Sequence, residues 1–184
     1  MKWERRLAVL VVILAFVLVV RGLWFAQEQQ QEIAPTISRA SPEIIEKGQP
    51  FYPIYFPTAD AELLAPEFRS GQVTIEQVLM DLQEGPRLPF LVSVLPPETK
   101  VISYAKHGTI LFVNFSDHLV SNHTGGSRAE ILTVYGIVNN LVGIDGVEQV
   151  QILVENERLH TLVGHLYIED PLPKDDSILG YQTF

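Results

Sequence analysis

The chain contains no cysteine among its 184 residues. This absence excludes disulfide bonds, thiol nucleophiles, cysteine metal ligands and a lipid anchor attached to cysteine. At this length we expect one soluble domain with additional segments.

Basic residues are also scarce, because 13 lysines and arginines stand against 22 aspartates and glutamates, for a net charge of −9. The first 21 residues still have a basic excess, from Lys2, Arg5, Arg6 and Arg21 against Glu4. The rest of the chain is therefore more acidic than the total suggests. Phosphate contacts need clustered lysine and arginine, so this acidic part argues against nucleic acid as a partner.

Familiar catalytic motifs are missing as well, including the G-x-S-x-G sequence of α/β-hydrolases. Ser116, Asp117 and His118 have the residue types of a hydrolytic triad, but adjacent residues rarely converge on one point. His118 and His123 share a loop with Asp117 and Asn122, which is the nearest approach to a metal-ligand cluster. Zinc sites usually show short fixed spacings on defined elements, so a solvated polar loop is the simpler interpretation.

Gly125, Gly126 and Ser127 precede a predicted helix, and helix N-termini present free N–H groups that can bind an anion. The lysine of a phosphate-binding loop is absent, and Arg128 is a weak substitute. We therefore interpret this stretch as the start of a helix. We expect no catalytic, cofactor-binding or metal-ligating residues, no cofactor and no enzymatic activity.

The longest apolar run is Leu7 to Val20, and it continues beyond Arg21 to Ala26. With Arg21 extended towards the interface, residues up to Ala26 approach the roughly 20 residues of a membrane span. A cleaved signal peptide is the competing interpretation, but Trp24 is too bulky for a small-x-small site before Ala26. The basic start predicts a single-pass protein of the cell membrane, with the N-terminus cytoplasmic and the domain extracytoplasmic.

Composition divides the chain into four parts. We expect a cytoplasmic tip and transmembrane signal anchor over residues 1–26 and a flexible linker over 27–49, where the sequence is polar and contains few large apolar residues. A folded domain follows over 50–172. Residues 173–184 form a C-terminal tail, which either crosses the domain surface or stays disordered.

The stretch from Gly125 to Val154 has the most regular pattern in the chain. Ser127 and Glu130 have capping-box spacing, and apolar residues then recur at a helical period with one buried face. Gly143 suits the left-handed residue after a helix, and Asp145-Gly146 suits a turn. Alternation over the following residues predicts a strand that ends at Val154.

The other elements follow from the same rules. We expect the following set: a strand over Pro50 to Pro57, a short strand over Leu63 to Arg69, a helix over Thr74 to Glu84, a partly buried loop over Leu88 to Glu98, a hairpin from Val101 to Phe115 with its turn at His107-Gly108, and a last strand over Arg158 to Val163. This β(β)αββαββ order predicts an α+β fold in which two helices pack on a mainly antiparallel sheet.

Residues from about 52 to 172 resemble the GerMN domain family. The matching stretches are YPIYFPTADAELLAPEFR, VLMDLQEGP, VLPPETKVISYAKHGTILFVNFSDHL and GGSRAEILTVYGIVNNLVGIDGVEQVQILVENERLHTLVGHLYIEDPL. The resemblance implies a protein outside the cytoplasmic membrane of a Gram-positive, spore-forming bacterium. Such domains are similar to ring-building motifs, which implies assembly rather than catalysis. The family offers no catalytic residues to carry over.

These observations lead to one functional expectation and one alternative. We expect a membrane-anchored structural or interaction protein of the cell envelope, in sporulation or germination, whose partners are the membrane, envelope or sporulation proteins, or further copies of itself. For self-assembly we expect exposed contacts at Arg128, Asn139 and Gln149. The alternative is a module that binds peptidoglycan or a small ligand, with an aromatic platform drawn from Phe51, Tyr52, Tyr55 and Phe56.

Overall fold

A computed structural model describes residues 50–180 of the chain. The predicted signal anchor and linker, residues 1–49, and the last residues of the tail, 181–184, lie outside the described part. Between residues 50 and 180, none of the helices has both the length and the apolar character needed to cross a membrane.

The described chain forms two β-sheets with helices between them. β1 (Phe51–Pro57) and β2 (Leu64–Ser70) pair antiparallel as a two-stranded hairpin. The second sheet has the order β3 (Val101–His107), β4 (Ile110–Phe115), β5 (Gln149–Val154) and β6 (Leu172–Pro173). The helices are α2 (Ile75–Glu84), α3 (His118–Ser121) and α4 (Ser127–Leu141), with short 3₁₀ turns η1 (Ile144–Gly146) and η2 (Asp176–Ile178).

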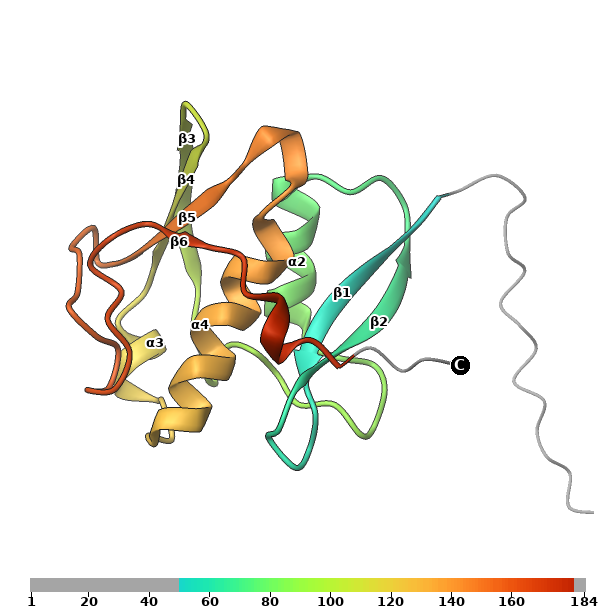
Figure 1. Ribbon diagram of the computed structural model, residues 1–184, viewed down its shortest axis with the longest axis horizontal. Helices are drawn as coiled ribbons and strands as arrows, with labels where there is room; N and C mark the ends of the chain where they lie inside the picture. The colour runs from blue at the N-terminus through green and yellow to red at the C-terminus, as the bar shows by residue number, and fades with distance from the viewer. Residues whose placement is uncertain (1–49, 181–184) are drawn as a thin grey trace, which may run out of the picture. The chain divides into compact units, whose positions relative to one another are not determined.

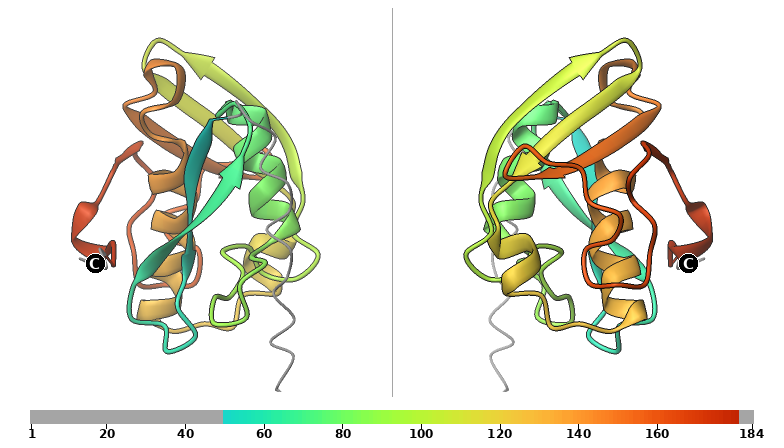
Figure 2. Two further views of the ribbon diagram at one scale, coloured as in Figure 1. Left: turned by 90° about the vertical axis from the view of Figure 1, so that its right-hand side faces the viewer. Right: turned by 90° about the vertical axis from the view of Figure 1, so that its left-hand side faces the viewer.

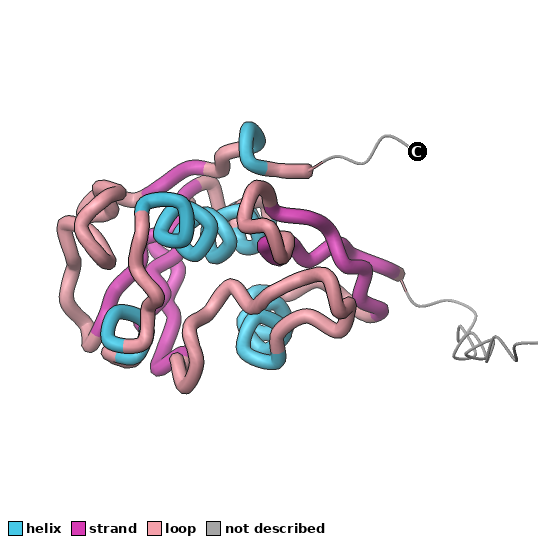
Figure 3. Tube along the Cα trace, turned by 90° about the horizontal axis from the view of Figure 1, so that it is seen from below, coloured by secondary structure: helices cyan, strands magenta, loops and turns pink. Residues whose placement is uncertain are grey.

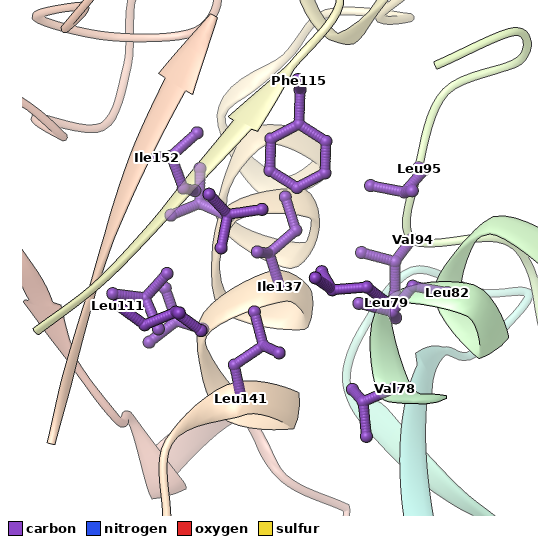
Figure 4. Close-up of a cluster of buried hydrophobic side chains, with 14 of the residues drawn as sticks. Val78, Leu79, Leu82, Val94, Leu95, Leu111, Phe115, Ile137, Leu141 and Ile152 are labelled. Atoms are coloured by element: carbon purple, nitrogen blue, oxygen red, sulfur yellow. The ribbon is translucent and has the colours of Figure 1, made fainter. Parts of the chain in front are cut away.

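Helices α2 and α4 occupy the space between the four-stranded sheet and the β1–β2 hairpin (Figure 1, Figure 3). Apolar side chains from all these layers meet in one core (Figure 4). The core includes Val78, Leu79 and Leu82 of α2, Ile137 and Leu141 of α4, Leu111 and Phe115 of β4, Ile152 of β5, and Val94 and Leu95 of the loop before β3. The loop over 88–98 is partly buried as predicted, because Leu91, Val94 and Leu95 are buried whereas Val92 is exposed.

The predicted α+β class and most of the element order are confirmed, with two corrections to the sheets. The strands divide into a hairpin and a separate sheet instead of one sheet. Within the larger sheet, β4 and β5 are parallel, because the chain between them crosses over through α3 and α4. The other neighbouring pairs in both sheets are antiparallel.

Local sequence signals determine where helix α2 begins and ends. Thr74 caps its first turn, because the Gln77 N–H donates to Thr74 Oγ1 at 3.1 Å. Gly85 ends the helix with a φ of 84°, and Gly143 follows α4 with a φ of 98°. The β3–β4 turn is one residue later than predicted, because His107 pairs with Ile110 and the two-residue loop begins with glycine at position 108.

Helix α4 differs from its prediction in both its cap and its environment. Its N-cap is Gly126, and the Ser127 side chain makes no capping hydrogen bond. The predicted capping box is therefore wrong. The helix is also buried on more than one face, since 10 of its 15 residues are buried. The cause is its central position between the two sheets.

The carboxylate of Glu130 is fully buried and holds the segment that follows β5. Its Oε1 accepts the N–H groups of Leu162 and Val163 at 2.8 and 3.0 Å, and its Oε2 accepts that of His165 at 2.8 Å. The predicted strand over Arg158 to Val163 is therefore wrong. This segment makes few strand-to-strand hydrogen bonds. It runs beside α4 (Figure 2), where the Glu130 side chain accepts its backbone N–H groups.

Two asparagines in the last turns of α4 act in the same way. Asn140 accepts the Tyr55 N–H through Oδ1 and donates to the Tyr55 carbonyl through Nδ2, both at 2.8 Å. Asn139 pairs with the backbone of Asp175 at 2.9 and 2.7 Å. Helix α4 thus contacts β1 on one side and the C-terminal segment on another through specific hydrogen bonds.

Replacing Glu130 by alanine should destabilise the domain by about 3 kcal/mol or more, because three backbone N–H groups lose a buried, charged acceptor. Urea unfolding measures the loss, and hydrogen exchange should show faster exchange at Leu162, Val163 and His165 than elsewhere. Glu148→Ala, at an exposed position, is the matched control. Unchanged exchange at those three amides would contradict the assigned role of Glu130.

Gly136 is the close contact between α4 and the loop before β3. A Cβ at this position would lie 2.8 and 2.9 Å from the two γ-carbons of Val94. Gly136→Ala should therefore destabilise the fold by roughly 1–3 kcal/mol. In the double variant with Val94→Ala, the penalty specific to Gly136→Ala should largely disappear, and a double-mutant cycle of unfolding free energies measures this. Additive effects would mean that the two residues are not in conflict.

Candidate functional site

Ser116, Asp117 and His118 have the residue types of a hydrolytic triad but do not form a catalytic arrangement. The Ser116 hydroxyl accepts the Lys100 N–H at 3.0 Å and is buried. His118 Nδ1 lies 3.1 Å from Asp117 Oδ1, but the Asp117 side chain is 66 % exposed. His118 Nε2 lies 3.6 Å from Glu98 Oε2, which is also at the surface. A hydrolase that used Asp117 and His118 would need both side chains to converge in a pocket, and their exposed positions contradict this.

The histidine loop does not form a metal-ligand cluster either. Within residues 50–180, no group of three histidine or carboxylate side chains is placed to hold a metal ion. His118 pairs with Asp117, whereas His123 turns to Thr133 of α4, with 3.2 Å between Nε2 and Oγ1. The two histidines thus contact different parts of the fold.

The start of α4 is poorly suited to an anion. Arg128 uses its Nε to bind the carbonyl of Ala61 at 3.1 Å. Glu130, a carboxylate, lies in the first turn of the helix. A negative charge in the first turn already interacts with the positive end of the helix dipole and would repel a second anion.

The predicted aromatic platform is also wrong. Tyr52 and Phe56 are buried in the core, at 6 % and 0 % exposure, because they lie on the inner face of β1. Phe51 lies on the opposite face and is 53 % exposed. The alternation of a strand therefore divides the four aromatic residues between two faces.

A buried ionic cluster joins the hairpin to the end of α2. Arg69 Nη2 lies 2.7 Å from Glu67 Oε1 and donates to the Gly85 carbonyl at 2.7 Å. Glu67 Oε2 accepts the N–H groups of Arg87 and Leu88, both at 2.8 Å. Both charged side chains are nearly inaccessible. We interpret this cluster as structural, because its groups hold the backbone after α2 in place.

The neighbouring Tyr52–Asp81 pair belongs to the same interface. The Tyr52 hydroxyl donates to Asp81 Oδ2 at 2.5 Å, and Gln77 donates to the other carboxylate oxygen at 3.1 Å. Burial, together with the hydrogen bond to Asp81, raises the pKa of Tyr52 well above its usual value. The phenol therefore stays protonated and acts as a donor between β1 and α2.

A cavity of about 440 Å³ lies between the loop before β3, the loop before α4 and the N-terminal half of α4. Its lining combines proline, valine and leucine side chains with hydroxyl, amide and imidazole groups, including His123 and Thr133. Asp117 and His118 are not part of this lining. The sequence analysis missed the cavity, because its walls come from segments far apart in the chain.

One face of the β1–β2 hairpin is unusually apolar for an exposed surface. Pro53 and Phe68 are paired across the strands, and Phe51 is on the same face. Phe68 is 67 % exposed. We call Phe51, Pro53 and Phe68 the hairpin aromatic face. The other end of this face is covered, because Leu64 packs with Leu132, Ile178 and Leu179.

The contacts expected for self-assembly are only partly at the surface. Arg128 is exposed and Gln149 is half-buried, with its side-chain amide bound to the Pro171 carbonyl. Asn139 is only 4 % exposed and pairs with Asp175, so its predicted exposure is wrong. An asparagine in an apolar helix here marks an internal hydrogen bond rather than a surface.

Burial lowers the pKa of His123 below its ordinary value of 6.5, against an opposing influence of Glu130. As pH falls below that value, the unfolded chain binds the proton first, so the stability from the neutral ring, present above it, is lost. His123→Gln should therefore reduce the fall in unfolding free energy between about pH 7.5 and about pH 5. Denaturant unfolding at both pH values measures this, with exposed His107→Gln as the control. Equal pH dependence of wild type and His123→Gln would contradict it.

The two sheets, the helices between them and the cavity define a single-copy α+β domain. A profile of the Germane family, described as sporulation and spore germination, matches residues 53–160. The chain belongs to this family, and its domain is of the GerMN type.

Two solved structures of GerM domains show the same fold. The tandem GerMN domains of the sporulation protein GerM from Bacillus subtilis are 18 % identical, with a TM-score of 0.56 over 68 % of this chain and 46 % of that one. The first GerMN domain of that protein is 17 % identical, with a TM-score of 0.53 over 68 % of this chain and 99 % of the other. A Clostridium perfringens protein described as a lipoprotein is 24 % identical, and the match, with a TM-score of 0.48, covers 70 % of this chain and 90 % of the other. No curated protein matches the chain.

Proposed function

We propose that this protein is a membrane-anchored, extracytoplasmic interaction protein of the bacterial cell envelope, which contributes to a scaffold in sporulation or germination. The family membership supports the biological setting. The apolar run from Leu7 to Ala26, preceded by basic residues, supports a single-pass anchor with a cytoplasmic N-terminus. In this proposal the protein acts by contact and carries out no reaction.

The hairpin aromatic face is the observation that carries the proposal. Phe51 and Phe68 are each more than half exposed, and Pro53, which is exposed on the same face, pairs with Phe68 and lies two residues after Phe51. Contiguous exposed apolar surface usually marks a site of contact with another molecule. Aromatic side chains are also the residues most often found at the energetic centre of protein interfaces.

The position of this face suits a partner close to the membrane. Phe51 is the first residue of β1, and the expected linker immediately precedes it in the chain. The acidic charge of the chain makes an anionic lipid surface an unfavourable partner for the face itself. We therefore propose a protein partner, either another envelope or sporulation protein or a second copy of this chain.

Phe68→Ser should weaken the partner interaction by about tenfold or more, because an exposed aromatic anchor is lost. Its side chain is at the surface, so the unfolding free energy should change little. Phe90→Ser is a matched control, since Phe90 is 56 % exposed and lies on the loop after α2. Crosslinking of the full chain in the membrane identifies the partner, and sedimentation of the detergent-solubilised chain tests for self-association.

The biological part of the proposal has its own readout. The Phe68→Ser chain should replace the wild-type chain poorly in sporulation or in germination, when the two are scored separately. Normal spore yield and normal germination in a strain that lacks the gene would overturn the sporulation role. Equal crosslinking of Phe68→Ser and wild type would overturn the assignment of the surface.

A further inference from the structure

The cavity beside α4 has walls that are fixed before any ligand arrives. On one side, Val94 packs directly against Gly136 of α4. On another, Asn122 donates through Nδ2 to the Pro97 carbonyl at 2.8 Å, which joins the loop before α4 to the loop before β3. Its volume of about 440 Å³ is within the range of small-molecule sites.

Hydrogen-bonding groups in the lining are oriented and incompletely used. The Gly125 N–H donates to His123 Nδ1 at 3.0 Å, so the neutral ring carries its proton on Nε2 and donates it to Thr133 Oγ1. The hydroxyl proton of Thr133 is then left for another acceptor. The Thr99 hydroxyl is buried and has no hydrogen-bond partner among the described residues. A buried hydroxyl without a partner is costly unless a further molecule satisfies it.

The charge of the lining restricts the class of ligand. None of the lining residues is lysine or arginine, and the one carboxylate is that of Glu98. A phosphate or carboxylate would therefore meet no counter-charge in the cavity and would be repelled by Glu98. The remaining surface is aliphatic, with prolines at positions 57, 96 and 97, and it contains no phenylalanine, tyrosine or tryptophan on which a ring could stack.

We propose that this cavity is a binding site for an uncharged ligand that carries a secondary amide on an aliphatic or acetamido group. The Thr133 hydroxyl donates to the amide carbonyl, and the methyl or aliphatic part packs on the proline and leucine side chains. The same amide chemistry occurs in peptides and in N-acetylated amino sugars. The site uses none of the residues of the hairpin aromatic face, so it is independent of the proposed scaffold role.

The test uses the full chain in detergent micelles and three small probes. N-acetyl-L-alanine methylamide supplies the neutral peptide amide, N-acetyl-D-glucosamine supplies the amide on a sugar, and N-acetyl-L-alanine supplies the same amide with a carboxylate. Chemical-shift changes of methyl groups in Leu95 and Leu132, which line the cavity, report binding. We expect at least one neutral probe to bind about tenfold more tightly than the anion. Whichever neutral probe binds better identifies the peptide or the sugar as the source.

Two variants locate the probe, and a third serves as control. Thr133→Val should lower the affinity for the neutral probe by about fivefold, because one hydrogen bond is lost. Glu98→Gln changes an exposed side chain. It should leave the affinity for the neutral probe unchanged and raise the affinity for the anion about twofold. Thr109→Val, at the exposed β3–β4 turn, should change neither affinity.

The proposal is overturned if neither neutral probe shifts the cavity methyl groups, or if the anion binds as tightly as the neutral amides. It is also overturned if Glu98→Gln leaves the ratio of anion to neutral affinity unchanged. Glu98→Gln replaces a surface side chain by one of equal size and should therefore fold. The affinity ratio measured with this variant tests the proposal even if Thr133→Val does not fold.

Discussion

A buried backbone without a sheet partner must find its hydrogen bonds elsewhere, and in this domain helix α4 supplies them. Glu130, Asn139 and Asn140 project from three sides of the helix and bind the backbone of segments that have little or no ladder there. The loop after β5, the C-terminal segment and one edge of β1 are all held in this way. The two sheets are thus joined through a helix whose polar side chains do as much to define the fold as its apolar ones.

Local elements were predictable from the sequence where their signals are local. The cap at Thr74, the stop at Gly143 and the alternation in β5 need only neighbouring residues, and the structure contains each of them. The predicted capping box at Ser127 is wrong because the Glu130 carboxylate instead accepts backbone N–H groups that lie 32 to 35 residues further along the chain. The strand predicted over 158–163 failed for the same reason, since its N–H groups bond to a side chain that no local pattern reveals.

The candidate sites depended on tertiary structure even more strongly. Which aromatic residues of β1 are exposed follows from the side of the strand that faces the main core, and the composition of the stretch does not specify that side. The cavity needs the loop before β3 and the first half of α4 to be adjacent, and the sequence gives no sign of this contact. One signal was available. Two adjacent asparagines inside an apolar helix are poor helix formers and indicate buried polar contacts.

The attachment of both ends of the domain to α4 also determines when it can fold. Tyr55 pairs with Asn140 across 85 residues of sequence, and Asp175 pairs with Asn139 across 36. The Asn139 side chain therefore has no partner until residue 175 has been synthesised, whereas the partner of Asn140 precedes the helix in the chain. During synthesis, a partly emerged domain would expose the apolar faces of α4 and β1 together, because the segment that completes their cover comes last.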